Sequence, residues 1–343
     1  MAKPGNNNLH MSKAGKQDEF YTQLPMIENE LKYYKNHFEG KTVLCNCDDP
    51  YESNFFKFFA MRFNILKLKK LIASCYDRSP IAQTQLSLFE EDRPPQERSP
   101  YCAKMIELED YNGDGAANIS DVEWLLKNKK DAVKKLEGNG DFRSGECIEL
   151  LKQADIVVTN PPFSLFREYV AQLMEYDKKF IILGRGTATT YKEILPLFLS
   201  NRLWLGRTNG HFWFRVPDNY DPKATDFKID EDGVKWRRMG NICWFTNLDY
   251  KERHEDIILY REYDPAVYPK YDNYDAIDVS EVSEIPKDYD GVMGVPTTFL
   301  LKWNPDQFEI LGSSRYHDGS WESNDINFVN GKGKFTRILI RRK

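Results

Sequence analysis

The strongest constraint on the fold comes from residues 42–75, where a strand, a helix and a second strand are expected in succession. Residues 42–45 are short and apolar, and Ser53 or Asn54 is placed to cap a helical pattern that ends at Asn64. The inward side of this pattern carries Phe55, Phe56, Phe58, Phe59 and Phe63. Residues 66–75 then predict the second strand. Strands joined by a helix pair in parallel, so the segment predicts an α/β fold with helices covering a parallel sheet.

The alternation continues, with helices expected at residues 120–136 and 165–176 and strands at residues 154–159 and 179–183. From residue 203 onward the chain is rich in Trp, Tyr, Phe and Pro and contains short strand-like runs. We therefore predict an α/β domain over residues 1–202 and a C-terminal region, 203–343, that adds the remaining core strands and long loops. Within the first domain, residues 78–104 predict a flexible loop that is rich in proline and acidic residues.

The charge balance limits how this chain can bind nucleic acid. Its 343 residues include 48 Lys plus Arg and 53 Asp plus Glu, which gives a net charge of -5. Such a chain has no global positive field, so any DNA-binding surface must be local. No run approaches the roughly 18 apolar residues of a membrane span, and the N-terminal residues are polar, so we expect a cytoplasmic protein.

Six cysteines are scattered without zinc-ligand spacing, so we expect buried thiols and assign no metal site to them.

Asn160, Pro161, Pro162 and Phe163 follow directly on the strand at residues 154–159. An asparagine oxygen and the next carbonyl can both accept hydrogen bonds from an amino group, and proline holds that carbonyl rigidly. The adjacent aromatic ring can stack on a planar substrate. This arrangement orients an NH2 lone pair toward an electrophile; the alternative is a strand that ends in a proline-rich turn. We expect Ser164 to cap the helix that follows.

Other acidic and aromatic residues stand where ligands bind in α/β sheets, beyond the carboxyl ends of strands. Asp77 follows the second strand and is placed to accept hydrogen bonds from ribose hydroxyls. Asp141 is placed to accept from an adenine amino group while Phe142 lies against the adenine ring. Each alone also fits a solvated turn residue.

These residues resemble the EcoRI-type adenine-specific DNA methyltransferases, and the resemblance spans nearly the whole chain. The segments that carry it are Asp18-Glu-Phe-Tyr-Thr22, Cys45-Asn-Cys-Asp-Asp-Pro50, Gly140-Asp-Phe-Arg-Ser144, Asn160-Pro-Pro-Phe-Ser-Leu-Phe-Arg167, Trp244-Phe-Thr-Asn-Leu-Asp249, Lys270-Tyr-Asp-Asn-Tyr-Asp-Ala276 and Gly291-Val-Met-Gly-Val-Pro296. It implies a Rossmann-like S-adenosylmethionine-dependent methyltransferase sheet with an added target-recognition region of strands and loops. It also implies transfer of a methyl group to N6 of a flipped adenine in double-stranded DNA.

The resemblance assigns further roles at the cofactor. Tyr21 and Thr22 would close over the methionine end, Asp48 and Asp49 would hold its amino group, and Asp77 and Asp141 would hold ribose and adenine. The usual glycines of the first motif are replaced here by Cys45-Asn-Cys-Asp-Asp-Pro50. Arg185 stands in a stretch that is Asn-rich in similar proteins, which adds charge near the substrate.

Two further motifs leave their interpretation open. Asp110, Asn112, Asp114, Asn118 and Asp121 follow calcium-loop spacing, but the last position is Asp instead of Glu, so a weak cation site and an ion-free turn before a helix both remain. Gln85, Leu86, Ser87, Leu88 and Phe89 are similar to the pentapeptide that docks on the bacterial DNA polymerase sliding clamp. The alternative is a loop that packs its own Leu and Phe.

Local basic segments are candidates for DNA phosphate contacts: 235–238, 332–337 and 341–343. Solvated charge at a strand edge is the alternative. We expect residues 205–240 to recognise the bases of the target sequence. The rival functions are methylation of RNA adenine or protein glutamine, or a catalytically silent cofactor- or clamp-binding protein.

Overall fold

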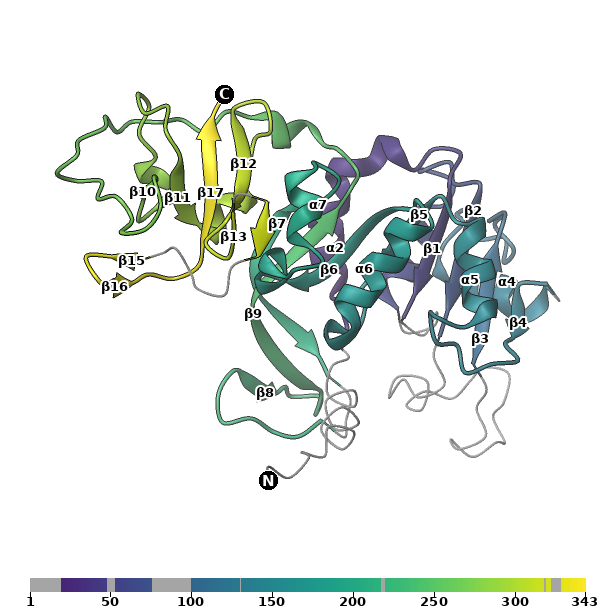
Figure 1. Ribbon diagram of the computed structural model, residues 1–343. Coiled ribbons are helices and arrows are strands. Elements are labelled where there is room, and N and C mark those ends of the chain that lie inside the picture. Colours follow the sequence, from purple (N-terminus) through teal and green to yellow (C-terminus); the bar gives the residue numbers. More distant parts are fainter. Residues whose placement is uncertain are drawn as a thin grey trace, which may run out of the picture. The chain divides into compact units, whose positions relative to one another are not determined.

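The computed structural model describes residues 20–47, 53–75, 100–129, 131–216, 220–317, 319–321 and 328–343. Two compact units make up the chain, Met1–Arg185 with Thr208–Leu248 and Gly186–Arg207 with Asp249–Lys343 (Figure 1). Predictions for Asp48, Asp49, Asp77 and the clamp segment Gln85–Phe89 lie outside the described residues. The functional division at residue 202 stays a prediction.

The first unit alternates helices and strands over most of its length. Its helical elements are α2 (Leu24–Leu31), η1 (Lys32–His37), α3 (Asn54–Met61), α4 (Ile119–Asn128), α5 (Gly145–Gln153), η3 (Phe163–Leu165) and α6 (Phe166–Glu175). Its strands are β1 (Thr42–Asn46), β2 (Lys70–Ser74), β3 (Tyr101–Met105), β4 (Val133–Lys135), β5 (Ile156–Thr159), β6 (Lys179–Arg185), β8 (Phe227–Ile229) and β9 (Lys235–Thr246), together with most of β7 (Trp204–Arg215).

One mixed sheet organises this unit, with strand order β4-β3-β2-β1-β5-β6-β9-β7 and β8 paired to β9. Strand β1 pairs in parallel with β2 on one side and β5 on the other, and β5 pairs in parallel with β6. Helix α3 connects β1 to β2, and the Ser53 hydroxyl caps it by accepting from the Phe56 N–H. The predicted β-α-β segment and the α/β fold class are therefore confirmed.

Helices cover both faces of the central sheet. Trp244 and Phe245 are consecutive residues of β9, so their side chains point to opposite faces. Phe55 of α3 packs on Trp244, with ring centroids 6.0 Å apart, whereas Phe166 of α6 packs on Phe245 at 4.8 Å. Figure 1 shows α5 and α6 together on the face toward the viewer. The parallel strands are thereby buried from both sides, as their apolar sequences require.

The helix predicted over residues 120–136 is wrong in its second half. Helix α4 ends at Asn128, and residues 133–135 form β4, which pairs antiparallel with β3. The apolar spacing fits a helix, but the main-chain groups of β3 at this edge need partners, and β4 supplies them. Asn118 caps α4. The cap expected at Ser164 is wrong, because Leu165 stands at the N-cap of α6.

The second unit is built from short strands and loops. Its helical elements are η4 (Gly186–Thr190), α7 (Leu195–Leu199), η5 (Lys251–His254), η6 (Val282–Glu284) and η7 (Thr297–Leu301). Its strands are β10 (Ile277–Asp278), β11 (Met293–Pro296), β12 (Phe308–Ser313), β13 (Tyr316–His317), β14 (Ser320–Trp321), β15 (Phe328–Val329), β16 (Lys332–Gly333) and β17 (Arg337–Arg342). A sheet of order β10-β11-β17-β12-β13-β14 holds its core, and β15 pairs with β16.

Within the part of the chain that the structure describes, no helix has the length and apolar character needed to cross a membrane.

One ion cluster of the second unit contains a histidine between two carboxylates. The His254 Nε2 atom lies 2.9 Å from an Asp249 carboxylate oxygen, and its Nδ1 atom contacts Asp306. Both ring nitrogens can donate only when the ring is protonated. The hydrogen bonds to Asp306 and Asp249 raise the pKa of His254 above its ordinary value.

We expect His254→Gln to destabilise the protein most at low pH. A raised folded-state pKa adds stability that is fully present below the unfolded pKa of about 6.5 and is lost as the pH rises through the folded-state pKa. The difference in urea midpoint between wild type and variant, measured from about pH 5.5 to about pH 9, should therefore shrink with rising pH. A difference that stays constant over this range would show that the carboxylates do not stabilise the charged ring.

Candidate active site

The carboxyl ends of β1 and β5 meet at one edge of the sheet. Val43 lies opposite Ile156 in the parallel register, which brings Asn46 to the end of β5. The Thr159 hydroxyl donates to the main-chain oxygen of Asn46, and the Tyr169 hydroxyl donates to the Asn46 side-chain oxygen. The next residue after Thr159 is Asn160, so these bonds hold it at the rim of the sheet.

The side chain of Asn160 is buried, and its amino group has a hydrogen-bond partner whereas its oxygen has none among the described residues. Its Nδ2 atom donates to the Phe20 carbonyl at 2.7 Å, which assigns the amide orientation and turns Oδ1 the other way. Asn160 is 7% exposed, and its Oδ1 has no hydrogen-bond partner among the described residues. A buried acceptor without a partner costs about 1–3 kcal/mol. The site therefore offers a fixed acceptor for an N–H group.

Phe163 lies in an aromatic cluster beside this amide. Its ring stacks on Phe20, with centroids 5.7 Å apart and 26° between planes. Phe20 in turn makes edge contacts with Phe214 at 5.8 Å and Tyr220 at 6.3 Å. The sequence reasoning placed Phe163 here but missed Phe20 and Phe214. The signal for Phe20 was its position in segment 18–22, which carries part of the family resemblance.

Tyr21 and Thr22 continue from Phe20 along the same edge. Tyr21 pairs with the main chain of Arg215, and its ring lies 5.3 Å from the Arg215 guanidinium carbon. The Thr22 carbonyl accepts from the Asn54 side chain at 2.7 Å, at the first turn of α3. The Thr22 Oγ1 atom is buried and, among the described residues, has no hydrogen-bond partner. The structure thus brings both predicted residues close to the segment that holds Asn160.

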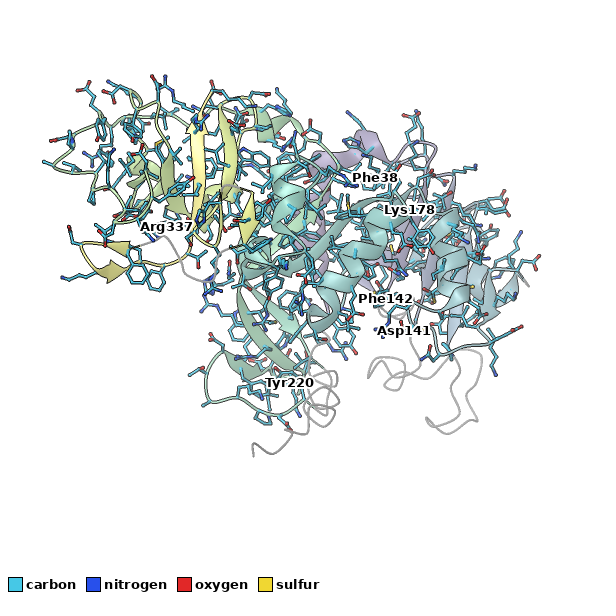
Figure 2. All side chains as sticks on the ribbon, viewed as in Figure 1. Phe38, Asp141, Phe142, Lys178, Tyr220 and Arg337 are labelled. Atoms are coloured by element: carbon cyan, nitrogen blue, oxygen red, sulfur yellow. The ribbon has the colours of Figure 1, made fainter. Side chains whose placement is uncertain are left out.

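Asp141 and Phe142 come from the loop between β4 and α5 (Figure 2). Arg143 donates to both Asp141 oxygens, from Nε at 2.9 Å and from Nη2 at 2.7 Å. This pairing holds the pKa of Asp141 below its ordinary value, so the carboxylate stays ionised. Phe142 is largely buried, and its ring contacts Tyr169 edge-on at 5.0 Å. Tyr169, which the sequence reasoning missed, thereby links Phe142 to Asn46.

The loop that carries Asp141 is tied to the end of β2. Gly140 has φ 75°, and a Cβ atom built on it would lie 2.0 Å from the Cys75 carbonyl oxygen. Only glycine fits this close approach of two backbones. The contact holds the loop of Asp141 against Cys75, the residue that follows β2.

Cys47, directly after β1, adopts φ 91°. This left-handed backbone favours glycine and is uncommon for other residues. The usual glycines of the first motif are absent from the sequence, yet the backbone still takes a glycine-like conformation at Cys47. The other cysteines are buried, as expected.

Cations and indole rings alternate on β8, β9 and the neighbouring part of β7. The Lys228 ammonium lies 4.8 Å from the Trp213 ring and 5.8 Å from the Trp236 ring. Arg237 donates to the Asp226 carbonyl at 2.9 Å, and Arg238 lies 3.8 Å from the Asp226 carboxylate. These residues include the predicted basic segment 235–238, so that segment combines charge with flat rings, as DNA-binding surfaces do.

One predicted phosphate contact is wrong. Arg337 is 7% exposed, and its Nε atom donates to Asp278 at 2.9 Å in the second unit. Tyr271 donates to the same Asp278 oxygen. The buried Arg337 therefore neutralises Asp278 and is not available to DNA.

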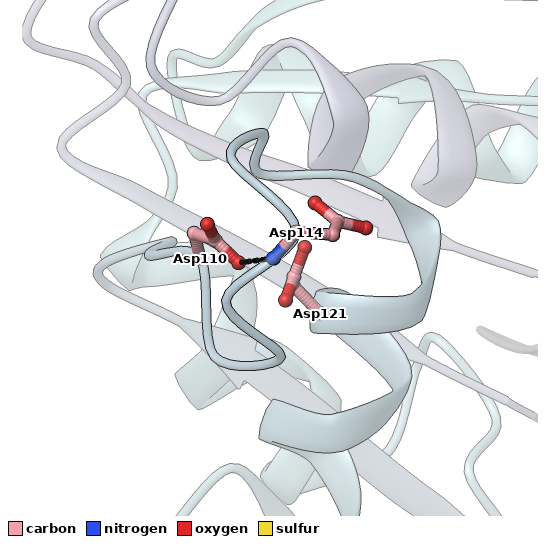
Figure 3. Close-up of side chains that lie close together, drawn as sticks. All are labelled: Asp110, Asp114 and Asp121. Carbon is pink, nitrogen blue, oxygen red and sulfur yellow. Dashed lines mark hydrogen bonds between the residues drawn. The ribbon is translucent and has the colours of Figure 1, made fainter.

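The acidic loop before α4 brings Asp110, Asp114 and Asp121 together, with one oxygen of each within 4.8 Å of the others (Figure 3). Asp110 accepts from the main-chain N–H groups of Gly113 and Gly115. The Asp121 oxygens accept from the N–H groups of Tyr111, Asn112 and Asn118. These bonds account for the turn and the cap of α4 without an ion, and both sequence interpretations remain.

Comparisons with known proteins identify relatives of the chain. A family model described as "Adenine-specific methyltransferase EcoRI" matches residues 8–343. The chain is 45% identical to the type II methyltransferase M.EcoRI of Escherichia coli over 352 residues, which cover 98% of this chain and 97% of the relative. It is 37% identical to M.MpnI of Mycoplasma pneumoniae, with 98% of each chain covered, and 34% identical to M.MgeORF184P of Mycoplasma genitalium, with 98% and 99% covered. No solved structure matches the chain significantly.

The contact between Gly140 and Cys75 can be tested with a matched glycine. Gly113 has nearly the same φ, 76°, but a Cβ built there meets nothing within 4 Å. We expect Gly113→Ala to cost about 1–3 kcal/mol of stability from backbone strain alone, and Gly140→Ala to cost clearly more. Urea unfolding of both variants checks this. Equal losses would mean that the loop moves away from Cys75 without penalty.

Proposed function

Because the chain belongs to the EcoRI family of adenine-specific methyltransferases, we propose that Asn160 binds the target amino group and that S-adenosylmethionine donates the methyl group. The family and its type II relatives make the chain an enzyme that methylates adenine in DNA. This favours DNA over the RNA and glutamine alternatives. The DNA substrate also supports the expected cytoplasmic location.

The observation that carries the catalytic role is the buried, unpartnered Oδ1 atom of Asn160. The Phe20 carbonyl accepts from Nδ2, which fixes the orientation of the amide and leaves Oδ1 as a buried acceptor without a partner among the described residues. An adenine N6 amino group is a donor and completes this site. The Pro161 carbonyl is the proposed second acceptor, and the two prolines hold the main chain that follows Asn160. Two acceptors on the amino hydrogens aim the nitrogen lone pair at the methyl donor.

Residues around the same edge fit a nucleoside with an amino-acid tail. Thr22 has a buried hydroxyl without a partner among the described residues, close to α3. The ionised Asp141 carboxylate remains partly exposed and can accept from an adenine amino group while Arg143 holds it. When bound, S-adenosylmethionine supplies an electrophilic methyl group. Tyr21 and Phe142 are proposed to shape its binding site, and Asp48, Asp49 and Asp77 complete the proposed set.

Reaching Asn160 requires the adenine to leave the duplex. Extrusion of a base costs a few kcal/mol, and stacking on an aromatic ring offsets part of this cost. Phe163 is only partly buried and stands next to Asn160, so we assign it this stacking role. The basic and aromatic residues between 205 and 240 are proposed to bind the surrounding DNA.

Asn160→Ala should abolish methyl transfer while leaving cofactor binding within a few-fold, because the side chain orients the acceptor and not the donor. Asp141→Ala, the matched change on the cofactor side, should instead weaken cofactor binding. Sequencing of single DNA molecules from expressing cells reports methylated adenines, and calorimetry reports cofactor affinity. Near-normal turnover of the Asn160 variant on duplex DNA would rule out the proposed mechanism.

Phe163→Ala should reduce activity less when the target adenine is already mispaired. Stacking on Phe163 is proposed to offset the free energy of extruding the adenine from the duplex. A mispaired adenine costs less to extrude, so its methylation should depend less on Phe163. Single-turnover rates on paired and mispaired duplexes of otherwise identical sequence test this expectation. Equal losses on the two duplexes would argue against a stacking role for Phe163.

A further inference from the structure

Arg185 is the last residue of β6, the strand next to β5. Thr159 lies opposite Ile182 in the register of these strands, so Arg185 follows at the edge where Asn160 leaves the sheet. The Arg185 guanidinium carbon lies 5.7 Å from the ring centroid of Phe163. Its side chain is exposed. A permanent positive charge therefore lies over the ring that we assign to the target base.

Three cations lie over aromatic rings around the proposed acceptor site. Besides Arg185 over Phe163, these are Arg215 over Tyr21 at 5.3 Å and Lys223 over Tyr220 at 5.8 Å. Arg215 and Lys223 have additional partners. Across the described ranges, the Arg185 guanidinium makes this ring contact and no hydrogen bond or ion pair. Its charge is therefore not neutralised by any residue that the structure describes.

The ring contact leaves the hydrogen-bonding capacity of Arg185 unused. A guanidinium contacts an aromatic ring through its flat face, whereas its N–H donors point outward in its plane. That fork matches two oxygens of a phosphate. Phe20 already stacks on the Phe163 ring, so a base that stacks there takes the place of Arg185, whose N–H donors are then free for an anion beside the ring.

DNA supplies such an anion when the target nucleotide swings out. The sugar and its flanking phosphates move with the base, so a base held by Asn160 and Phe163 carries a phosphate into the same region. We propose that Arg185 binds a backbone phosphate that flanks the extruded adenine and thereby holds the nucleotide in its flipped position. This inference rests on the proposed function, because it requires the adenine to bind at Asn160 and Phe163.

The salt dependence of DNA binding tests the proposal. Each phosphate contact contributes about 0.9 to the slope of log K against log salt on double-stranded DNA. Arg185→Gln should reduce the magnitude of the slope by about this amount on a duplex that contains the methylated site. On a duplex of equal length without the site, the slope should not change, since no base is extruded there. Arg185→Lys keeps the charge and should retain most of the slope.

Arg62 provides the matched control. Its guanidinium carbon lies 4.4 Å from the Phe58 ring, and its charge is paired with Glu28. Arg62→Gln removes the same kind of Arg–Phe contact at a residue to which we assign no DNA contact, so it should leave both slopes unchanged.

An unchanged slope for Arg185→Gln on the target duplex would overturn the proposal, and Arg185 would then serve only to pack against the Phe163 ring. An equal reduction on both duplexes would also overturn it, because the phosphate would then be bound without base extrusion. The wild-type protein must first methylate a defined adenine, since its site defines the target duplex. Failure at that step would refute the proposed function and this inference with it. If methylation occurs, the slope measured for Arg185→Gln tests the role of Arg185 alone.

Discussion

The parallel pairing of β1 with β5 is the constraint on which the site depends. It places Asn46 beside Thr159, and the Thr159 hydroxyl then bonds the Asn46 carbonyl oxygen. Because parallel strands end at the same edge, the residues that follow β1, β5 and β6 gather there without being near in sequence. Asn160 and Arg185 belong to this edge, and Tyr169 on the following helix reinforces it by bonding to Asn46.

The N-terminal segment 20–22 converts this edge into a site with a defined orientation. The Phe20 carbonyl holds the Asn160 amide, and the Phe20 ring holds Phe163. Buried polar atoms at Asn160 and Thr22 lack partners in the described part of the chain. Unsatisfied groups of this kind lower stability by about 1–3 kcal/mol each and are typical of functional sites, where a ligand supplies the missing partner.

The same segment connects the acceptor to the surface that we assign to DNA. Tyr21 pairs with Arg215 of β7, and Phe20 contacts Phe214 and Tyr220. A shift of this surface on DNA would therefore act directly on the residues that hold Asn160 and Phe163. This physical connection gives a route by which target recognition and base positioning can depend on each other.

The sequence by itself determined the α/β class, a Ser or Asn cap at the start of α3 and the position of Asn160 to Phe163 after a strand. These features follow from local patterns, namely apolar periodicity, capping residues and proline, which need no distant partner. It did not determine that residues 133–135 form a strand, that Phe20 holds Asn160, or that Arg337 is buried against Asp278. Each of these depends on a partner that is distant along the chain: an edge strand that needs main-chain partners, a side-chain amide that needs an acceptor, and a buried carboxylate that needs a positive charge. Only the tertiary structure brings such groups together, because hydrogen bonds and ion pairs act over a few ångströms in space and not along the sequence.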